Sequence, residues 1–415
     1  MKAEIISIGD ELLIGQVINT NAVFIAKQLT AVGFQVGKIV TVEDKGESIK
    51  EAMGSVGEET KLVVLTGGLG PTKDDLTKQA LLEFFKDEWT ENNEALENVK
   101  RIFKDNQHAL IEENFLQAKV PSRAKVLQNE RGTAPGLWFE NENCIYIALP
   151  GVPFEMKGLL IKKVLPELVQ RFSLPSIVQK TIITSGLGES LLFERLKDLE
   201  GQLPSHIKLA YLPGPGRVRL RLMAVGEDKD ELQVELNSWI AKIIERLENH
   251  YAGVEGEDSL VAVIATRLTS AKKTLAVSES FTGGKLAGLF TTIPGAATYF
   301  KGGVVPYYTE MKTEILGVSP ETIQKYSVVS AEVAKEMALK TKEKFESDYA
   351  ISTTGNAGPT KGDSDAEIGT AYIGLATPEE TKTYEFFLGE EREEIVERAI
   401  FKVLEILYKE IYELN

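Results

Sequence analysis

The chain has 415 residues, enough for two or three domains, and its 43% hydrophobic and 26% charged side chains are typical of soluble globular proteins. It carries 47 Lys and Arg against 62 Asp and Glu, and this net charge of -15 argues against direct binding to nucleic-acid backbones. One cysteine excludes an intrachain disulfide, and three widely separated histidines argue against a histidine-rich zinc site or a histidine charge relay. Without a signal-peptide pattern or a run of ~20 apolar residues, we expect a cytoplasmic protein that has no membrane contact.

Strand and helix patterns alternate over residues 1–172. Apolar stretches at 3–9, 35–44, 61–68 and 144–153 predict strands. Amphipathic stretches at 21–34, 48–59 and 157–172 predict the helices between and after them. This alternation favours an α/β domain with a parallel sheet, whose ligand would bind beyond the carboxyl ends of the strands.

A glycine-rich segment, TGGLGPTKDDLT, follows the predicted strand at 61–68. Backbone without a Cβ would allow a ligand to approach closely at Gly67, Gly68 and Gly70. Thr72 would cap a helix beginning near Lys73, whose free amides suit a phosphate. Asp74 and Asp75 would repel that anion unless a divalent cation lay between them. A plain glycine turn with acidic capping residues is the alternative, but the density of the motif favours a ligand site.

Two other strand exits would bring polar side chains to the same edge of the sheet. Asp10 follows the first strand, Asn21 lies at the start of the next helix, and Glu155 follows the strand at 144–153. Several carboxylates beside a phosphate-binding loop are what metal-assisted phosphoanhydride chemistry requires.

The motifs GDELLIGQVINTN, TGGLGPTKDDLT and ALPGVPFEM, in this order, resemble the molybdopterin-binding (MoaB/MogA-like) domain of the competence/damage-inducible protein A family, CinA. The resemblance implies a pyrophosphatase that cleaves ADP-ribose to AMP and ribose 5-phosphate with Mg²⁺, Mn²⁺ or Co²⁺. Asp74, Asp75, Asp10 and Glu155 are its candidate metal or water-activating groups. Glu113-Asn114 resembles a further family motif, which Phe115 and Leu116 interrupt.

Residues 173–252 predict a small α+β unit of strand, helix, hairpin around Pro213–Gly216, and helix. The loop Gly186–Glu189 resembles the backbone-clamping loop of KH-like modules. Because this loop carries a glutamate and no lysine, a linker domain is the favoured interpretation.

Residues 253–415 predict a third, α/β domain. Helices are expected at 259–273, 282–293, 330–345 and 392–414, and strands at 274–280, 348–355 and 370–377. In SESFTGG, Ser280 lies at a turn from strand to helix, where free backbone amides could stabilise an oxyanion. The usual role of such a serine is to cap the helix. As a nucleophile it needs a base, and a lysine could serve if burial lowered its pKa.

The motifs AVSESFTGG, YFKGGVVPYYTEMK and STTGNAGP resemble the CinA C-terminal domain, which is similar to nicotinamide mononucleotide deamidases. The resemblance places Ser280 on the nucleophile, Lys312 on its basic partner and Tyr307 on an assisting tyrosine. The expected substrate contacts are Thr282, Gly283, Gly284, Gly355 and Arg392, with amides after Thr282 and at Gly355 holding the oxyanion. No metal is implied for this step.

Several positions depart from the family pattern. Phe281 replaces a usual cysteine, and Val396 stands where many relatives carry a second arginine. Other departures lie near Tyr307 and in the glycine loop, at Pro306, Tyr308, Thr309, Asn356, Thr360 and Glu367. These changes affect predicted substrate contacts, whereas the Ser–Tyr–Lys set is intact.

The leading hypothesis is a pyridine-nucleotide salvage enzyme that deamidates nicotinamide mononucleotide and hydrolyses ADP-ribose. The resemblance also implies a homodimer. A non-catalytic competence or recombination adaptor acting through a protein partner, and a molybdopterin-binding protein, are the alternatives.

Overall fold

The computed structural model describes residues 1–415 except 73, 106–111, 142, 215–216, 256–258 and 412–415. The chain forms two compact units, residues 1–178 with 225–232 and residues 179–224 with 233–415. Within the described ranges, every helix is too short or too polar to cross a membrane.

The first unit is built on a six-stranded sheet of order β2-β1-β3-β8-β7-β6. The strands are β1 (Lys2–Ile8), β2 (Gln35–Val42), β3 (Thr60–Thr66), β6 (Lys125–Leu127), β7 (Gly136–Glu140) and β8 (Ile145–Leu149). The first four strands of the order are parallel, whereas β7 and β6 are antiparallel. A separate ribbon pairs β4 (Trp89–Glu91) with β5 (Lys119–Pro121).

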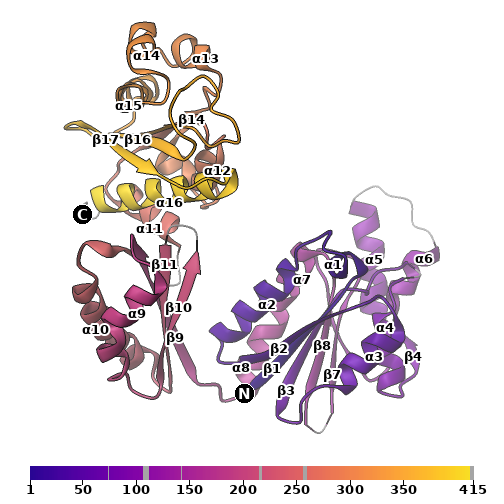
Figure 1. The fold of residues 1–415 in the computed structure, drawn as a ribbon. Helices are drawn as coiled ribbons and strands as arrows, with labels where there is room; N and C mark the ends of the chain where they lie inside the picture. The colour runs from indigo at the N-terminus through magenta and orange to yellow at the C-terminus, as the bar shows by residue number, and fades with distance from the viewer. Residues whose placement is uncertain (73, 106–111, 142, 215–216, 256–258, 412–415) are drawn as a thin grey trace. The chain divides into compact units, whose positions relative to one another are not determined.

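Helices cover both faces of this sheet (Figure 1). The helices of this unit are α1 (Asp10–Leu13), α2 (Thr20–Ala31), α3 (Gly46–Gly54), α4 (Thr77–Phe84), α5 (Asn93–Asp105), α6 (Glu112–Phe115), η1 (Leu116–Ala118), α7 (Pro153–Leu159), η2 (Leu160–Val164) and α8 (Leu165–Arg171). Alternate strand residues point to opposite faces, so Ile5 and Val64 pack with α2 and α7, while Ile6 and Leu65 pack with α3 and α4.

The predicted N-terminal α/β fold with parallel strands is confirmed, but the antiparallel edge of β7 and β6 was not predicted. Its strands are short and lie between loops, so they carry little periodic signal. The helix expected near Lys73 instead begins at Thr77, and Lys73 itself lies outside the described residues.

The middle segment forms a four-stranded sheet of order β10-β11-β9-β12 with two helices. Its elements are β9 (Ser176–Ser185), α9 (Glu189–Glu200), β10 (Ile207–Gly214), β11 (Arg217–Gly226), α10 (Lys229–Leu247), η3 (Glu248–His250) and β12 (Tyr251–Glu255). The predicted order of strand, helix, hairpin and helix is present.

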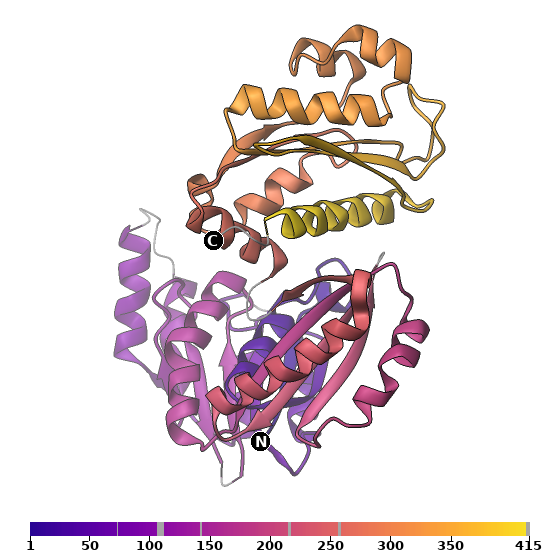
Figure 2. The same cartoon turned by 90° about the vertical axis from the view of Figure 1, so that its left-hand side faces the viewer.

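The last segment is a five-stranded sheet of order β14-β13-β15-β16-β17, with the first three strands parallel and the last two antiparallel. The strands are β13 (Leu275–Glu279), β14 (Phe300–Val304), β15 (Tyr349–Gly355), β16 (Thr370–Ala376) and β17 (Thr381–Phe387). The helices are α11 (Leu260–Ser270), α12 (Lys285–Thr291), η4 (Ala296–Thr298), α13 (Thr309–Glu314), α14 (Pro320–Tyr326), α15 (Ala331–Phe345) and α16 (Arg392–Glu410). Figure 2 shows α15, in orange, on one face of this sheet and α16, in yellow, on the other.

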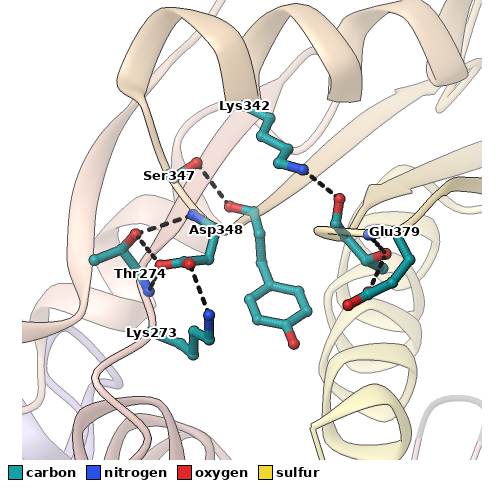
Figure 3. A network of polar contacts seen from close by, with 8 residues as sticks. Lys273, Thr274, Lys342, Ser347, Asp348 and Glu379 are labelled. Atoms are coloured by element: carbon teal, nitrogen blue, oxygen red, sulfur yellow. Dashed lines mark hydrogen bonds and ion pairs between the residues drawn. The ribbon is translucent and has the colours of Figure 1, made fainter.

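A polar network ties the amino ends of β13 and β15 together (Figure 3). The Asp348 carboxylate accepts hydrogen bonds from the Thr274 amide (2.9 Å), the Thr274 hydroxyl (2.8 Å) and Lys273 Nζ (3.0 Å). On the far side, Lys342 donates to the carbonyl of Thr377. Because β13 and β15 are parallel, this network holds the strand ends opposite to those that lead into the glycine-rich loops.

Candidate functional sites

Ser280 lies in the turn between β13 and α12. Its backbone amide donates to Thr353 O on β15 (3.0 Å), and the residue is 9% exposed. Gly283 (φ 62°) and Gly284 (φ 91°) adopt left-handed backbone conformations that L side chains disfavour. The glycines therefore allow the chain to reverse immediately after the serine.

Glu279, the last residue of β13, fastens this turn to the start of α12. Its buried carboxylate accepts the amides of Gly284 (3.1 Å), Leu286 (3.0 Å) and Ala287 (2.8 Å). The amide of Gly283 donates to Ser280 O (3.0 Å). In this arrangement Gly283 and Gly284 have no free amide for an oxyanion, which corrects the expectation drawn from the sequence.

Lys312 reaches Ser280 from α13. Its Nζ lies 3.1 Å from Ser280 Oγ and donates to the carbonyls of Pro306 (3.0 Å) and Tyr307 (3.4 Å). The residue is 1% exposed, and burial lowers its pKa to about 8, although the charge of Asp363 acts in the opposite direction. A substantial neutral fraction is therefore present near neutral pH, as a general base requires.

Tyr307 and Arg392 lie beside the Ser–Lys pair and contact each other. Arg392 Nη2 donates to the Tyr307 hydroxyl (2.8 Å), and Nη1 donates to Gly358 O (2.7 Å). The side chain of Tyr307 is 55% exposed, whereas its carbonyl faces Lys312. Tyr307 thus touches the lysine through its main chain and the arginine through its hydroxyl.

Three of the departures from the family pattern, at Phe281, Val396 and Thr309, have defined surroundings in the structure. Phe281 and Val396 are buried in one apolar cluster, and a Cβ at Gly355 would lie 2.9 Å from the Phe281 ring. The glycine is therefore required where the phenylalanine packs. The Thr309 hydroxyl donates to Asp363 (2.7 Å), which joins α13 to the loop at 356–369.

In the N-terminal domain, the carboxyl ends of the four parallel strands lie at one edge, as predicted. The amide of Asp10 donates to the Asp44 carboxylate (3.0 Å), and the amide of Asp44 donates to that of Asp10 (3.3 Å). Burial raises the pKa of Asp44, with further contributions from Asp10, Glu11 and Asp74. The charges of Asp10, Glu11 and Asp74 therefore lie near enough to Asp44 to disfavour its ionised form.

The glycine-rich loop is fastened from both sides. Gly67 (φ 114°) accepts a hydrogen bond on its carbonyl from the Thr77 hydroxyl (2.8 Å). Asn21 donates to the Thr66 hydroxyl (3.1 Å) and to Gly151 O (2.7 Å), and so joins two strand exits. The predicted Asn21 and loop residues are thus neighbours.

The sequence predicted that Thr72 caps a helix, but in the structure it forms hydrogen bonds within the loop instead. Its amide and hydroxyl donate to the Asp75 carboxylate, which packs so closely on Gly70 that no Cβ would fit there. A hydrogen bond from Thr72 also lowers the pKa of Asp74. The carboxylate of Asp75 is therefore occupied by the loop itself.

Glu155 contacts a different set of residues from those that contact the other predicted metal ligands. Asn129 donates to its carboxylate (2.6 Å), and burial raises its pKa. Within the described ranges, no three His, Cys, Asp or Glu side chains converge to hold an ion. The four predicted ligands, as arranged, do not fit a common metal site, although oxygen donors of this type suit a divalent cation.

Three residues at these sites were not predicted from the sequence: Asp44, Lys78 and Asp363. Asp44 follows β2 and could have been found by treating every parallel-strand exit alike. Lys78 lies one residue beyond the glycine motif, and only the fold shows that it is buried. Asp363 lies 51 residues after Lys312, in an irregular loop, and carries no local signal.

Family models match three parts of the chain: the probable molybdopterin binding domain over residues 4–170, the damage-inducible protein CinA KH domain over 179–253, and the CinA C-terminal domain over 257–411. A CinA-like protein of Flavobacterium psychrophilum is 45% identical over 99% of both chains. One of Cytophaga hutchinsonii is 37% identical over 100% of this chain and 99% of its own. A crystal structure of CinA from Thermoplasma acidophilum is 36% identical, with a TM-score of 0.37, covering 40% of this chain and 97% of its own. The chain belongs to the CinA family, with a MoaB-like N-terminal domain, a KH-like domain and a CinA C-terminal domain.

Proposed function

We propose that the C-terminal domain is an amidohydrolase that converts nicotinamide mononucleotide to nicotinic acid mononucleotide and ammonia. The observation that carries this proposal is the 3.1 Å contact between Lys312 Nζ and Ser280 Oγ in a buried environment. A serine needs a base to act as a nucleophile, and a lysine that is partly neutral at neutral pH supplies one. Nicotinamide mononucleotide is the substrate that the family resemblance implies.

In the proposed reaction, neutral Lys312 accepts the Ser280 proton as Oγ attacks the carboxamide carbon. The resulting lysine ammonium protonates the leaving nitrogen, the C–N bond breaks, and ammonia departs from an acyl-serine. Water, deprotonated by the same lysine, then attacks the ester and releases the carboxylate and the serine hydroxyl. The dyad provides every proton transfer that this route requires.

Arg392 is the proposed contact for the substrate phosphate. Two of its five N–H donors bind Gly358 O and the Tyr307 hydroxyl. The remaining donors of a guanidinium can bind phosphate oxygens, and its contact with Tyr307 would couple substrate binding to the segment that carries the carbonyl partners of Lys312.

The test measures ammonia release from nicotinamide mononucleotide by the full chain. Ser280→Ala and Lys312→Met should each lose at least 100-fold in kcat, since both remove a group that acts in the transition state. Ser270→Ala, at the exposed end of α11, is the matched control and should retain full activity. Unchanged turnover in either dyad variant would exclude the mechanism.

A second proposed activity is hydrolysis of ADP-ribose to AMP and ribose 5-phosphate by the N-terminal domain. It is supported by a glycine-rich loop at the carboxyl edge of parallel strands, where nucleotides bind in this class of sheet. The metal requirement stays a prediction, because the described carboxylates do not form a ready site. Hydrolysis that persists after chelation of Mg²⁺, Mn²⁺ and Co²⁺ would contradict it.

A further inference from the structure

A second buried lysine, Lys78, directly follows the glycine-rich segment of the N-terminal domain in the sequence. It is the second residue of α4 and is 8% exposed. The hydroxyl of the preceding residue, Thr77, donates a hydrogen bond to Gly67 O and so anchors the start of α4 to the loop. Lys78 therefore lies one residue from an anchor of the loop, and its amine is near enough to the loop residue Asp75 to respond to its charge.

Among the described residues, no carboxylate forms an ion pair with the ammonium group of Lys78. Its contacts in the described part of the chain are the side-chain oxygen (2.8 Å) and the carbonyl (3.2 Å) of Gln117, and no described carboxylate lies within ion-pair distance. Asp75 is near enough to raise its pKa, but burial dominates and lowers that pKa to about 8. Burial of a charge without a counter-ion is unfavourable, so an anion arriving here would stabilise the protonated lysine.

Gln117 adds an independent observation, a second buried donor with unused hydrogen-bonding capacity. The residue is 0% exposed, and among the described residues its side-chain nitrogen has no hydrogen-bond partner. Because Lys78 is a donor, it fixes the orientation of the carboxamide, with the oxygen toward the lysine and the NH₂ group left over. Lys78 and Gln117 thus place unused N–H donors side by side, and buried donors of this kind require an acceptor.

We infer that Lys78 and Gln117 form an oxyanion-binding site that takes a phosphate oxygen of a nucleotide held by the glycine-rich loop. Two N–H donors, one of them cationic, match a phosphate oxygen in both charge and hydrogen-bonding capacity. The Gly67 amide already donates to Leu149 O (3.1 Å), so the phosphate contacts inferred here are those of Lys78 and Gln117. The inference rests on the proposed nucleotide site, but it concerns binding and is independent of any hydrolysis.

The test is calorimetric titration of the full chain at pH 8 with AMP and, separately, with adenosine, which lacks the phosphate. Each titration is repeated in buffers of different ionisation enthalpy, which reports the protons taken up on binding. Since the pKa of Lys78 is about 8, roughly half the lysines are neutral at this pH, and AMP binding should take up about half a proton. The phosphate of AMP, with a second pKa near 6, is already a dianion and contributes little to this uptake.

Lys78→Met and Gln117→Glu should each weaken AMP binding at least tenfold, abolish the proton uptake and leave adenosine binding unchanged. Gln117→Glu keeps the shape of the side chain but supplies the counter-ion internally, so it tests the site even if Lys78→Met folds poorly. Lys27→Met, at an exposed position of α2, is the control lysine variant.

Three results would overturn the inference: unchanged AMP affinity and proton uptake in Lys78→Met, an equal loss of AMP and adenosine binding in both variants, or no AMP binding by the wild type at millimolar concentration. Phosphate-dependent AMP binding without ADP-ribose hydrolysis would uphold this site while refuting the proposed pyrophosphatase.

Discussion

The buried state of Lys312 predicts how the reactivity of Ser280 depends on pH. With a pKa of about 8 instead of 10.5, the amine is neutral in roughly one molecule in ten at pH 7, compared with about one in three thousand for an ordinary lysine. Burial therefore increases the fraction of competent base about 300-fold. Reactivity should rise about tenfold per pH unit below 8 and level off above it.

A fluorophosphonate that labels activated serines reports this dependence without relying on the natural substrate. Labelling of Ser280 is followed by mass spectrometry between pH 6 and 10 in the wild type, Lys312→Met and Lys312→Arg. Methionine lacks a base and arginine remains protonated, so both variants should lose about 100-fold or more in labelling rate. The exposed Lys335→Met serves as the control. A wild-type rate that is flat between pH 6 and 9 would refute the reasoning.

Three further predictions concern the surroundings of the dyad. Asp363→Asn removes a charge that raises the pKa of Lys312, so the pH at which labelling levels off should fall; an unchanged or higher midpoint would contradict this electrostatic role. Asp348→Ala leaves three donors of the network in Figure 3 without their acceptor. It should lower the free energy of unfolding of the C-terminal domain, measured in urea, by about 1–3 kcal/mol while Ser280 labelling persists. An unchanged free energy of unfolding would contradict this role of Asp348. Phe281→Cys should destabilise the domain by leaving a cavity, and Val396→Arg should do so by burying a charge. The double variant should lose less free energy of unfolding than the sum of the two single losses. Strict additivity in this double-mutant cycle would disprove the coupling.

Local sequence patterns were sufficient for the principal strands and helices of the first and last domains. The apolar runs that became β1, β3 and β13 are continuous because those strands are covered on both faces, and the glycine motifs follow them directly. The strands β14 and β17 were not predicted, since their exposed positions interrupt the apolar pattern. Periodicity reports burial, so it fails where a strand lies at an edge of its sheet.

The sites depended on contacts that no local pattern contains. The pairing of Ser280 with Lys312 was expected only through the family resemblance, because the two residues lie on different elements and 32 positions apart. The roles of the Gly283 and Gly284 amides were misjudged for a related reason. The Gly283 amide is bonded to Ser280 O and the Gly284 amide to the Glu279 carboxylate, and both partners are apparent only once the turn is folded.

The departures from the family pattern leave the dyad in place because main-chain groups hold it. Lys312 Nζ is oriented by the carbonyls of Pro306 and Tyr307, which any residue at those positions would supply. Ser280 is held by its own amide on β15, and its turn is held by Glu279. Side-chain changes at 281, 309 and 396 therefore alter what surrounds the reacting atoms rather than the distance between them. If these departures have a functional effect, it should appear in KM for the substrate, whereas the pH dependence of Ser280 labelling stays that of the Lys312 amine.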